Sequence, residues 1–166
     1  MRRLTLLLPL LFVLSAAAED WSSLQFMMGT WASDQSSTGD RGSGTGSFSL
    51  QPDLQGRVLV RKNFAEYPAS ESKPAYRHDD LMVMYRDAGS DPLRAMYFDN
   101  EGHVIRYTVT TGNGQAVFLS EEVSGQSRFR LTYNSPSADH LKLKFEIAPP
   151  GKDFATYIEA SMHRQK

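Results

Sequence analysis

The 166-residue chain contains no cysteine. Disulfide bonds, thiol catalysis and thiolate metal sites are therefore excluded, and the core must be held together by burial alone. The sequence also lacks a glycine-rich phosphate loop before a helix, a serine in a nucleophile elbow, and any long segment with helical periodicity. These absences favour an all-β protein without a recognisable catalytic motif.

The chain also has little net charge. The chain has 18 basic and 19 acidic residues, and the two kinds are interspersed. Nucleic-acid-binding proteins and proteins that bind anionic membranes carry a concentrated basic surface, so neither partner is expected.

Residues 1–18 have the three parts of a secretory signal peptide. Arg2 and Arg3 precede an apolar run over 4–14, which is followed by three alanines ending at Ala18. The run is shorter than the roughly 20 residues that span a bilayer, so no membrane span is expected in the mature chain. We predict cleavage near Ala18 and export to a periplasm or the medium. The remaining residues 19–166, with 16 basic and 19 acidic side chains, then form one domain with a formal charge of −3.

Short runs of β-forming residues alternate with turn signals about every ten residues, as in antiparallel sandwiches and barrels. We predict an all-β, up-and-down antiparallel barrel of about ten strands, preceded by a short helical plug over 21–28. The predicted strands are 29–34, 44–51, 57–66, 76–86, 93–99, 103–111, 115–121, 128–134, 140–148 and 154–163.

The turn at 99–102 is the best-defined local feature. Asp99 and Gly102 occupy the first and last positions of a type I turn, with aromatic and β-branched residues on both sides. Pairing Asp99 with His103 sets the register of this hairpin. If every strand pairs with the next, alternate connections lie at opposite ends of the barrel, so the helical plug closes one end and this turn lies at the open mouth.

Alternation assigns the inward faces of several strands. The inward sets are Leu93, Ala95, Tyr97, Asp99; His103, Ile105, Tyr107, Val109; Phe129, Leu131, Tyr133; Leu141, Leu143, Phe145, Ile147; and Phe154, Ile158, Met162. Arg94 and Arg106 are expected outside. Strands 57–66 and 76–86 are apolar on both faces, so their orientation stays open.

The chain resembles the lipocalin-like calycins. Gly29-Thr30-Trp31 matches their Gly-x-Trp at the start of the first strand, a short apolar turn precedes it, and about ten meandering strands follow. The resemblance implies a barrel with an internal ligand site. It also implies that Trp31 packs at the closed end under a basic side chain from beyond the last strand, here Arg164, in a cation–π contact.

Two departures refine this resemblance. The closed-end Thr-Asp-Tyr type motif of lipocalins is absent, because residues 110–114 read TTGNG. Ten strands are more similar to haem-binding nitrobindin-like barrels and to bacterial exported lipocalin-like proteins of unknown function. Nitrobindin-like barrels use a histidine near the C-terminus as haem ligand, whereas His163 is expected at the closed end, so no haem ligand is transferred and no cofactor is assigned.

We expect a binding protein for a small, largely apolar molecule rather than an enzyme. The predicted ligand-binding residues are Tyr97, Ile105, Tyr107, Leu131, Tyr133, Leu143 and Phe145 in the cavity; Asn63, Tyr76, His78, Asp80 and His103 at the rim; and Arg61, whose guanidinium can grip a carboxylate.

Two alternatives remain open. Histidine and carboxylate side chains suit metal binding or acid–base chemistry, so His78 and His103 could form a metal or haem site with isomerase or hydrolase activity. The large inward residues could instead fill the barrel, leaving function to interactions of the mouth loops. Residue spacing alone specifies neither the ligand nor the oligomeric state.

Overall fold

The computed structural model describes residues 18–34, 38–39, 44–87 and 92–166. The predicted signal segment therefore lies outside the described residues, apart from Ala18. The elements of the described chain are η1 (Ser22–Met27), β1 (Gly29–Ser33), β2 (Thr38–Gly39), β3 (Thr45–Asp53), η2 (Leu54–Gly56), β4 (Val58–Tyr67), β5 (Tyr76–Tyr85), β6 (Leu93–Asp99), β7 (Val104–Gly112), β8 (Gln115–Ser120), β9 (Arg128–Ser137), β10 (His140–Ala148) and β11 (Ala155–Arg164).

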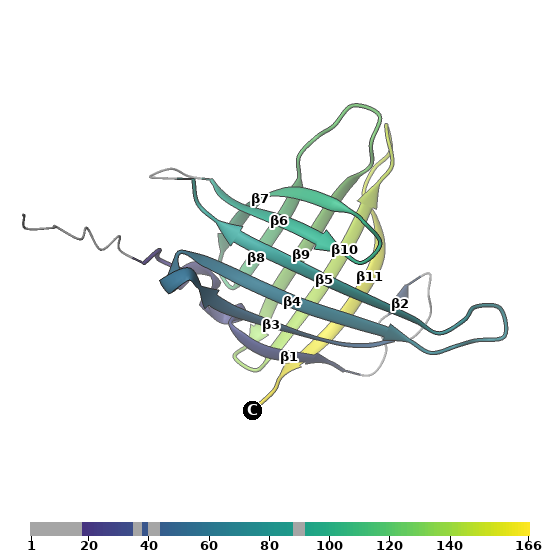
Figure 1. Cartoon of the computed structure of the whole chain (residues 1–166), viewed down its shortest axis with the longest axis horizontal. Coiled ribbons are helices and arrows are strands. Elements are labelled where there is room, and N and C mark those ends of the chain that lie inside the picture. Colours follow the sequence, from purple (N-terminus) through teal and green to yellow (C-terminus); the bar gives the residue numbers. More distant parts are fainter. Residues whose placement is uncertain (1–17, 35–37, 40–43, 88–91) are drawn as a thin grey trace, which may run out of the picture.

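The long strands form one closed antiparallel barrel, which confirms the predicted fold class. Each strand from β3 to β11 pairs with the next, and β1 joins both β3 and β11 to close the sheet. Strands β9 to β11 pass behind β3 to β5 in Figure 1, with the interior between them. The short strand β2, which was not predicted, pairs with β11 through Ile158 and Glu159.

The hairpin between β6 and β7 has the expected turn and register. Gly102 N–H donates to the Asp99 carbonyl at 3.2 Å, and Gly102 has a φ of +92°, which glycine adopts without steric cost. Tyr97 pairs with Ile105 and Leu93 with Val109, so the inward sets of these strands are as predicted.

The two ambiguous strands point their mixed polar sets inward. On β4, Leu59 and Arg61 are buried, and on β5 Met82 and Met84 are fully buried. Among the outward residues, Phe64 is covered by Arg77, whose guanidinium carbon lies 4.4 Å from the ring centroid. Aliphatic stems of charged residues cover apolar surface in this way, which explains why both faces of the strand read as apolar.

The prediction that Phe154 faces inward is wrong. The β10–β11 register shifts between Phe145 and Glu146, so that Phe145 pairs with Ile158 while Glu146 pairs with Thr156. This irregularity inserts one extra residue into β11 and reverses the alternation beyond it. Phe154 consequently packs under Arg130, 4.3 Å from guanidinium carbon to ring centroid, on the side where Arg130 binds Glu146.

The strand ends also differ from the predicted ranges in places. Strand β3 runs to Asp53, two residues beyond the prediction, and β9 runs to Ser137, three beyond it. Much of the predicted connection 135–139 is therefore strand. A register shift between His140 and Lys142 accompanies this extension.

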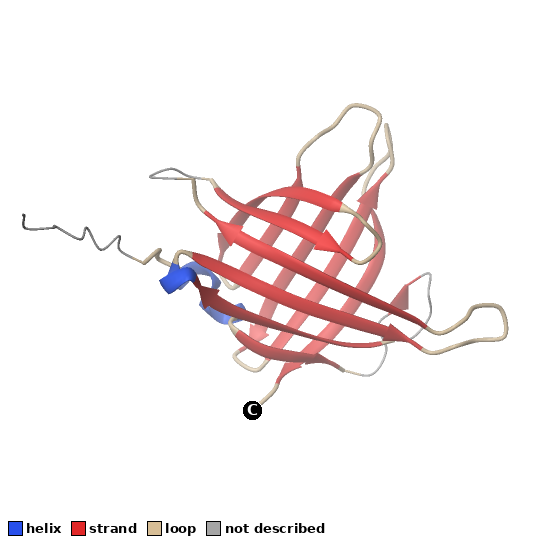
Figure 2. Ribbon diagram, viewed as in Figure 1, coloured by secondary structure: helices blue, strands red, loops and turns tan. Residues whose placement is uncertain are grey.

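The helical turns close one end of the barrel (Figure 2). Leu24 and Met27 of η1 are fully buried, and the Trp21 indole donates to the Gly56 carbonyl of η2 at 2.8 Å. Trp31 is also fully buried, and its indole donates to the Met27 carbonyl at 2.9 Å. The plug therefore follows the predicted 21–28 segment and is tied to the barrel by both tryptophans.

Arg164 covers Trp31 at this closed end. Its guanidinium carbon lies 4.2 Å from the indole centroid, and Nη1 donates to the Met28 carbonyl at 2.5 Å. Gly29 makes room for this arrangement, because a Cβ there would lie 2.9 Å from Arg164 Nη1. The contact implied by the Gly-x-Trp resemblance is thus present.

Aromatic rings fill the half of the barrel next to the closed end. Trp31, Phe48, Tyr133, Phe118 and Tyr107 form a chain in which neighbouring ring centroids lie 5.5 to 6.4 Å apart. Large side chains therefore occupy the closed-end half, and an internal ligand would enter from the other end.

Candidate functional site

A cavity of about 350 Å³ occupies the mouth half of the barrel. Its wall on β9 to β11 is apolar and includes Leu131, Leu143, Ile158 and Met162. The opposite wall, on β4 to β7, carries nearly all of its charged groups. The cavity is therefore two-sided, which suits a molecule with an apolar body and one polar group.

The structure brings almost all of the predicted site residues together. The cavity is lined by Arg61, Asn63, Tyr76, His78, Asp80, Tyr97, His103, Ile105, Tyr107, Leu131, Leu143 and Phe145. Tyr133 is the exception, because it is fully buried in the aromatic layer below the cavity. Burial raises the pKa of Tyr133 to about 12, so its hydroxyl stays protonated.

Arg61 and Asp80 form a buried ion pair at the base of the polar wall. Arg61 Nη1 lies 2.6 Å from Asp80 Oδ1, and each side chain is only 4% exposed. Burial acts to lower the pKa of Arg61, but the charge of Asp80, the neighbouring Tyr133 and Tyr97 and the hydrogen bond to Asp80 together outweigh it and raise the pKa above its usual value. The guanidinium also lies 5.2 Å from the Phe48 centroid, which seats the pair on the aromatic layer.

Asp80 also organises the groups above it. Its Oδ2 accepts a hydrogen bond from Asn63 Nδ2 at 2.7 Å and lies 3.4 Å from His78 Nε2. The adjacent Asp79 points away from the cavity and pairs with Arg77. Alternation along β5 therefore separates a buried, structured carboxylate from an exposed one.

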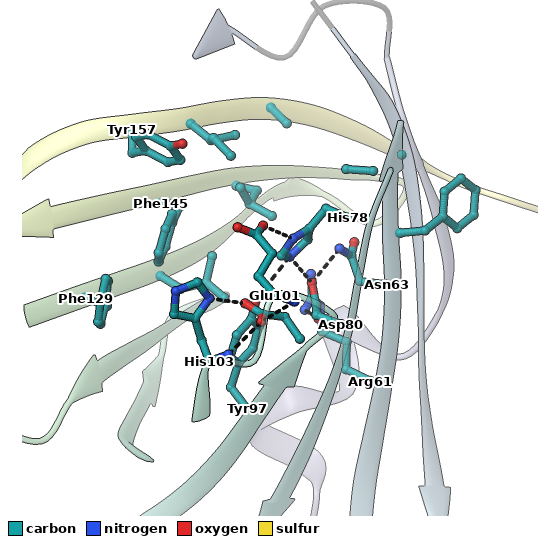
Figure 3. A pocket seen from close by; sticks show the side chains of 18 of the residues that line it. Arg61, Asn63, His78, Asp80, Tyr97, Glu101, His103, Phe129, Phe145 and Tyr157 are labelled. Carbon is teal, nitrogen blue, oxygen red and sulfur yellow. Dashed lines mark hydrogen bonds and ion pairs between the residues drawn. The ribbon is translucent and has the colours of Figure 1, made fainter. Parts of the chain in front are cut away.

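His78 is held by partners at both ring nitrogens. Nε2 lies 3.0 Å from the Tyr97 hydroxyl, and Nδ1 lies 3.0 Å from Glu101 Oε1 (Figure 3). Tyr76 donates to the same carboxylate oxygen of Glu101. The hydrogen bond to Asp80 raises the pKa of His78 above its usual value, against the opposing effect of burial, and Glu101 adds to the rise.

Asp99 holds His103 at the entrance. Its Oδ2 lies 2.9 Å from His103 Nδ1, and its Oδ1 accepts the His103 backbone N–H at 2.9 Å. Burial acts to raise the pKa of Asp99, but these two bonds, the charge of His103 and the Glu101 backbone N–H together outweigh it and hold the pKa below its usual value. The Asp99 side chain is 4% exposed whereas His103 is 58% exposed, so a buried carboxylate orients an accessible imidazole.

Tyr97 links these two groups. Its hydroxyl donates to Asp99 Oδ2 at 3.1 Å and also contacts His78. Burial, together with the charges of Asp80 and Asp99, raises the pKa of Tyr97 well above its usual value. The polar wall is therefore one connected network from Arg61 to His103.

Phe129, Tyr157 and Asp99 line the cavity but were not predicted as ligand contacts, whereas their neighbour Phe145 was. Phe129 and Phe145 stack with centroids 6.1 Å apart, and Tyr157 meets Phe145 edge-on at 6.1 Å. Tyr157 lies in the irregular part of β11, where alternation gives no reliable face. Phe129 had an inward assignment and Asp99 a rim position, so for these two the signal was already in the sequence.

The site has a limited set of metal donors. Among the residues that the structure describes, no group of three or more histidine, aspartate and glutamate side chains is placed to hold a metal ion. His78 would have to give up a hydrogen bond to act as a ligand, because both of its nitrogens are engaged. The metal or haem alternative stays a prediction without structural support.

The structure is a closed antiparallel barrel, and solved structures share this architecture. Rv2717c from M. tuberculosis aligns with a TM-score of 0.59 and 10% identity, covering 87% of this chain and 96% of that chain. The S-type phycobiliprotein lyase CPES from Guillardia theta aligns with a TM-score of 0.54 and 12% identity, covering 87% and 92%. At these identities the likeness concerns the fold.

Comparisons of the amino-acid sequence identify no related protein or family. No family model matches the chain, and no curated protein matches it.

Within the described part of the chain, no helix has the length and apolar character needed to cross a membrane.

The rise in the pKa of His78 makes a testable prediction. A raised pKa in the folded state means that proton binding favours folding, so this stabilisation is complete below the unfolded-state pKa and is lost as pH rises through the folded-state pKa. His78→Gln should therefore reduce the free energy of unfolding more at about pH 5.5 than at about pH 9. Urea unfolding at the two pH values measures this difference.

His140→Gln is the matched control, because His140 Nδ1 contacts the Ser137 hydroxyl rather than a carboxylate. An equal loss of stability at both pH values in His78→Gln would contradict the assigned role of Asp80 and Glu101.

Proposed function

We propose that this protein is exported and binds a small, largely apolar molecule inside the barrel. The observation that carries the proposal is the cavity of about 350 Å³ above a solid aromatic layer, with an apolar wall facing a preorganised polar one. A barrel that served only as a scaffold for its loops would gain stability by filling this space. Export rests on the arginines, apolar run and alanines of residues 1–18.

The preorganisation of the polar wall supports binding rather than mere solvation. Polar groups at strand ends usually meet water, yet Asp80 and Asp99 are almost fully buried and hydrogen-bonded on both oxygens. Such a network holds its side chains in fixed positions before a ligand arrives, which reduces the entropic cost of binding. The mouth connections then lie around the entrance rather than forming the whole functional surface.

Blocking the cavity should abolish binding. Ala160 lines the cavity from β11, so Ala160→Phe places an aromatic ring in the ligand space. We expect affinity for the uncharged fluorescent probe N-phenylnaphthylamine to fall at least about tenfold, as when a ligand loses well-packed apolar contact. Fluorescence titration measures the dissociation constant.

Ser161→Phe is the matched control, because Ser161 neighbours Ala160 on the same strand but is exposed. It should leave probe binding unchanged. Extraction of protein purified from its own compartment, followed by mass spectrometry, provides a second readout. Failure of the unmodified protein to bind the probe, together with an extract free of small molecules, would overturn the proposal.

A further inference from the structure

The cavity wall carries more negative than positive charge. Apart from its tyrosines, the ionisable residues among its described lining are the carboxylates Asp80, Asp99 and Glu101, one arginine, Arg61, and two histidines, His78 and His103. Even with His78 protonated, three carboxylates face two cations. Walls of low dielectric strengthen the effect of such an imbalance on a ligand.

Among the described lining residues, Arg61 is the one permanent cation, and it is already paired. Arg61 lies 2.6 Å from Asp80, and its side chain is only 4% exposed. A ligand carboxylate approaching this arginine would also approach Asp80, and both side chains would have to become more exposed. The wall therefore opposes an anionic head group, even though an arginine lines it.

His103 offers an acceptor to a ligand. When its ring is neutral, the proton belongs on Nδ1, which donates to Asp99, and this leaves the lone pair of Nε2 available. No hydrogen bond to Nε2 is formed by any other described residue. His103 lies on the side of the polar network that faces Phe129 and Phe145 (Figure 3).

The facing wall suits a cation. Phe129, Phe145 and Tyr157 form a continuous aromatic group through stacked and edge-on contacts at the mouth. The faces of aromatic rings attract ammonium groups, most strongly where water is excluded. An acceptor, an excess of carboxylate and aromatic rings thus surround the same entrance.

From this arrangement we propose that the ligand is a protonated amine with an apolar body. The apolar body lies against β9 to β11, and the ammonium group donates to His103 Nε2 within the field of Asp99 and Glu101. This inference rests on the proposed function, since it names the class of ligand for the same cavity.

Three eight-carbon molecules separate head-group charge from apolar size: octylamine, octanol and octanoate. Calorimetric titration of the purified protein at about pH 8 should rank octylamine first and octanoate last. Octylamine should bind at least about tenfold more tightly than octanol, a ratio that one desolvated cation–π contact accounts for. Octanol binding as tightly as octylamine would overturn the inference, and so would octanoate binding as tightly as either.

Glu101→Gln tests the role of charge directly. It removes one negative charge from the entrance and should weaken octylamine binding severalfold, and more than it weakens octanol binding. Glu159→Gln is the matched control, because Glu159 is an exposed carboxylate on β11 that contacts Lys144 outside the cavity. Unchanged octylamine affinity in Glu101→Gln would contradict the inference.

The two proposals fail in different ways. If the uncharged fluorescent probe also fails to bind, the cavity is not a binding site and the proposed function falls. If the probe binds while octylamine shows no advantage over octanol, binding stands and only the amine preference is overturned.

Discussion

Replacing Asp80 with asparagine is expected to reduce the free energy of unfolding by about 3–5 kcal/mol, the usual cost of leaving one member of a buried ion pair without its partner. Arg61 would keep its charge in a site where its side chain is 4% exposed. Asn63 and His78 would also lose the full carboxylate that they share. Urea unfolding followed by tryptophan fluorescence measures the change.

Asp79→Asn is the matched control for this experiment. Asp79 neighbours Asp80 on β5, but its ion pair with Arg77 lies on the surface, with both side chains 49% exposed. Exposed pairs contribute at most about 1 kcal/mol, so this variant should remain close to the unmodified protein. Similar losses of stability in the two variants would contradict the prediction that the buried pair of Asp80 contributes more than the exposed pair of Asp79.

A double variant tests whether the loss arises from the unpaired charge. Combining Arg61→Met with Asp80→Asn removes the stranded cation and should recover a large part of the lost stability, so that the two effects are strongly non-additive. A double variant that loses the sum of the two single effects would contradict the pairing.

The second large effect is expected at the closed end. Trp31→Ala should reduce the free energy of unfolding by about 3–5 kcal/mol, because it removes a fully buried indole and leaves a cavity. The loss includes the hydrogen bond to the Met27 carbonyl and the surface on which Arg164 lies. Thermal and urea unfolding both report the change.

Two milder substitutions divide this effect into parts. Trp31→Phe retains a ring but loses the indole N–H, so it should cost less than Trp31→Ala. Arg164→Met retains apolar cover but loses the donors to Met28 and Phe26, and should also cost less. If Arg164→Met lowers the free energy of unfolding as much as Trp31→Ala, the hydrogen bonds of Arg164 rather than the packing of the indole stabilise this end.

Much of the fold could be predicted because apolar and polar residues alternate along antiparallel strands that expose one face to solvent. The strand over 93–99 has the same bounds in the structure as in the prediction, and its hairpin partner has the same register. In β9, the apolar Phe129 and Leu131 alternate with basic residues, and this pattern was sufficient to place the inside. Local chemistry and tertiary packing agree in these elements.

The two strands whose faces could not be predicted, β4 and β5, carry the buried ion pair of the site. Arginine and aspartate are residue types usually found on the surface. Arg61 and Asp80 can be buried because their pairing across β4 and β5 offsets the free-energy cost of burying each charge. That pairing depends on a contact 19 residues apart in sequence, which alternation within one strand does not reveal. The bulge in β11 also prevented a correct prediction of the faces of Tyr157 and Phe154, because an extra residue interrupts the two-residue repeat.

The seam between β1 and β11 has a consequence for how the chain folds. It joins Trp31 to Arg164 and Ala32 to His163, so the barrel closes through residues about 130 positions apart. Contacts of such long range form late, because ordering the intervening chain costs entropy before the contact can repay it. A nascent chain lacking β11 would therefore present two unpaired sheet edges, and closure must wait until β11 has been synthesised.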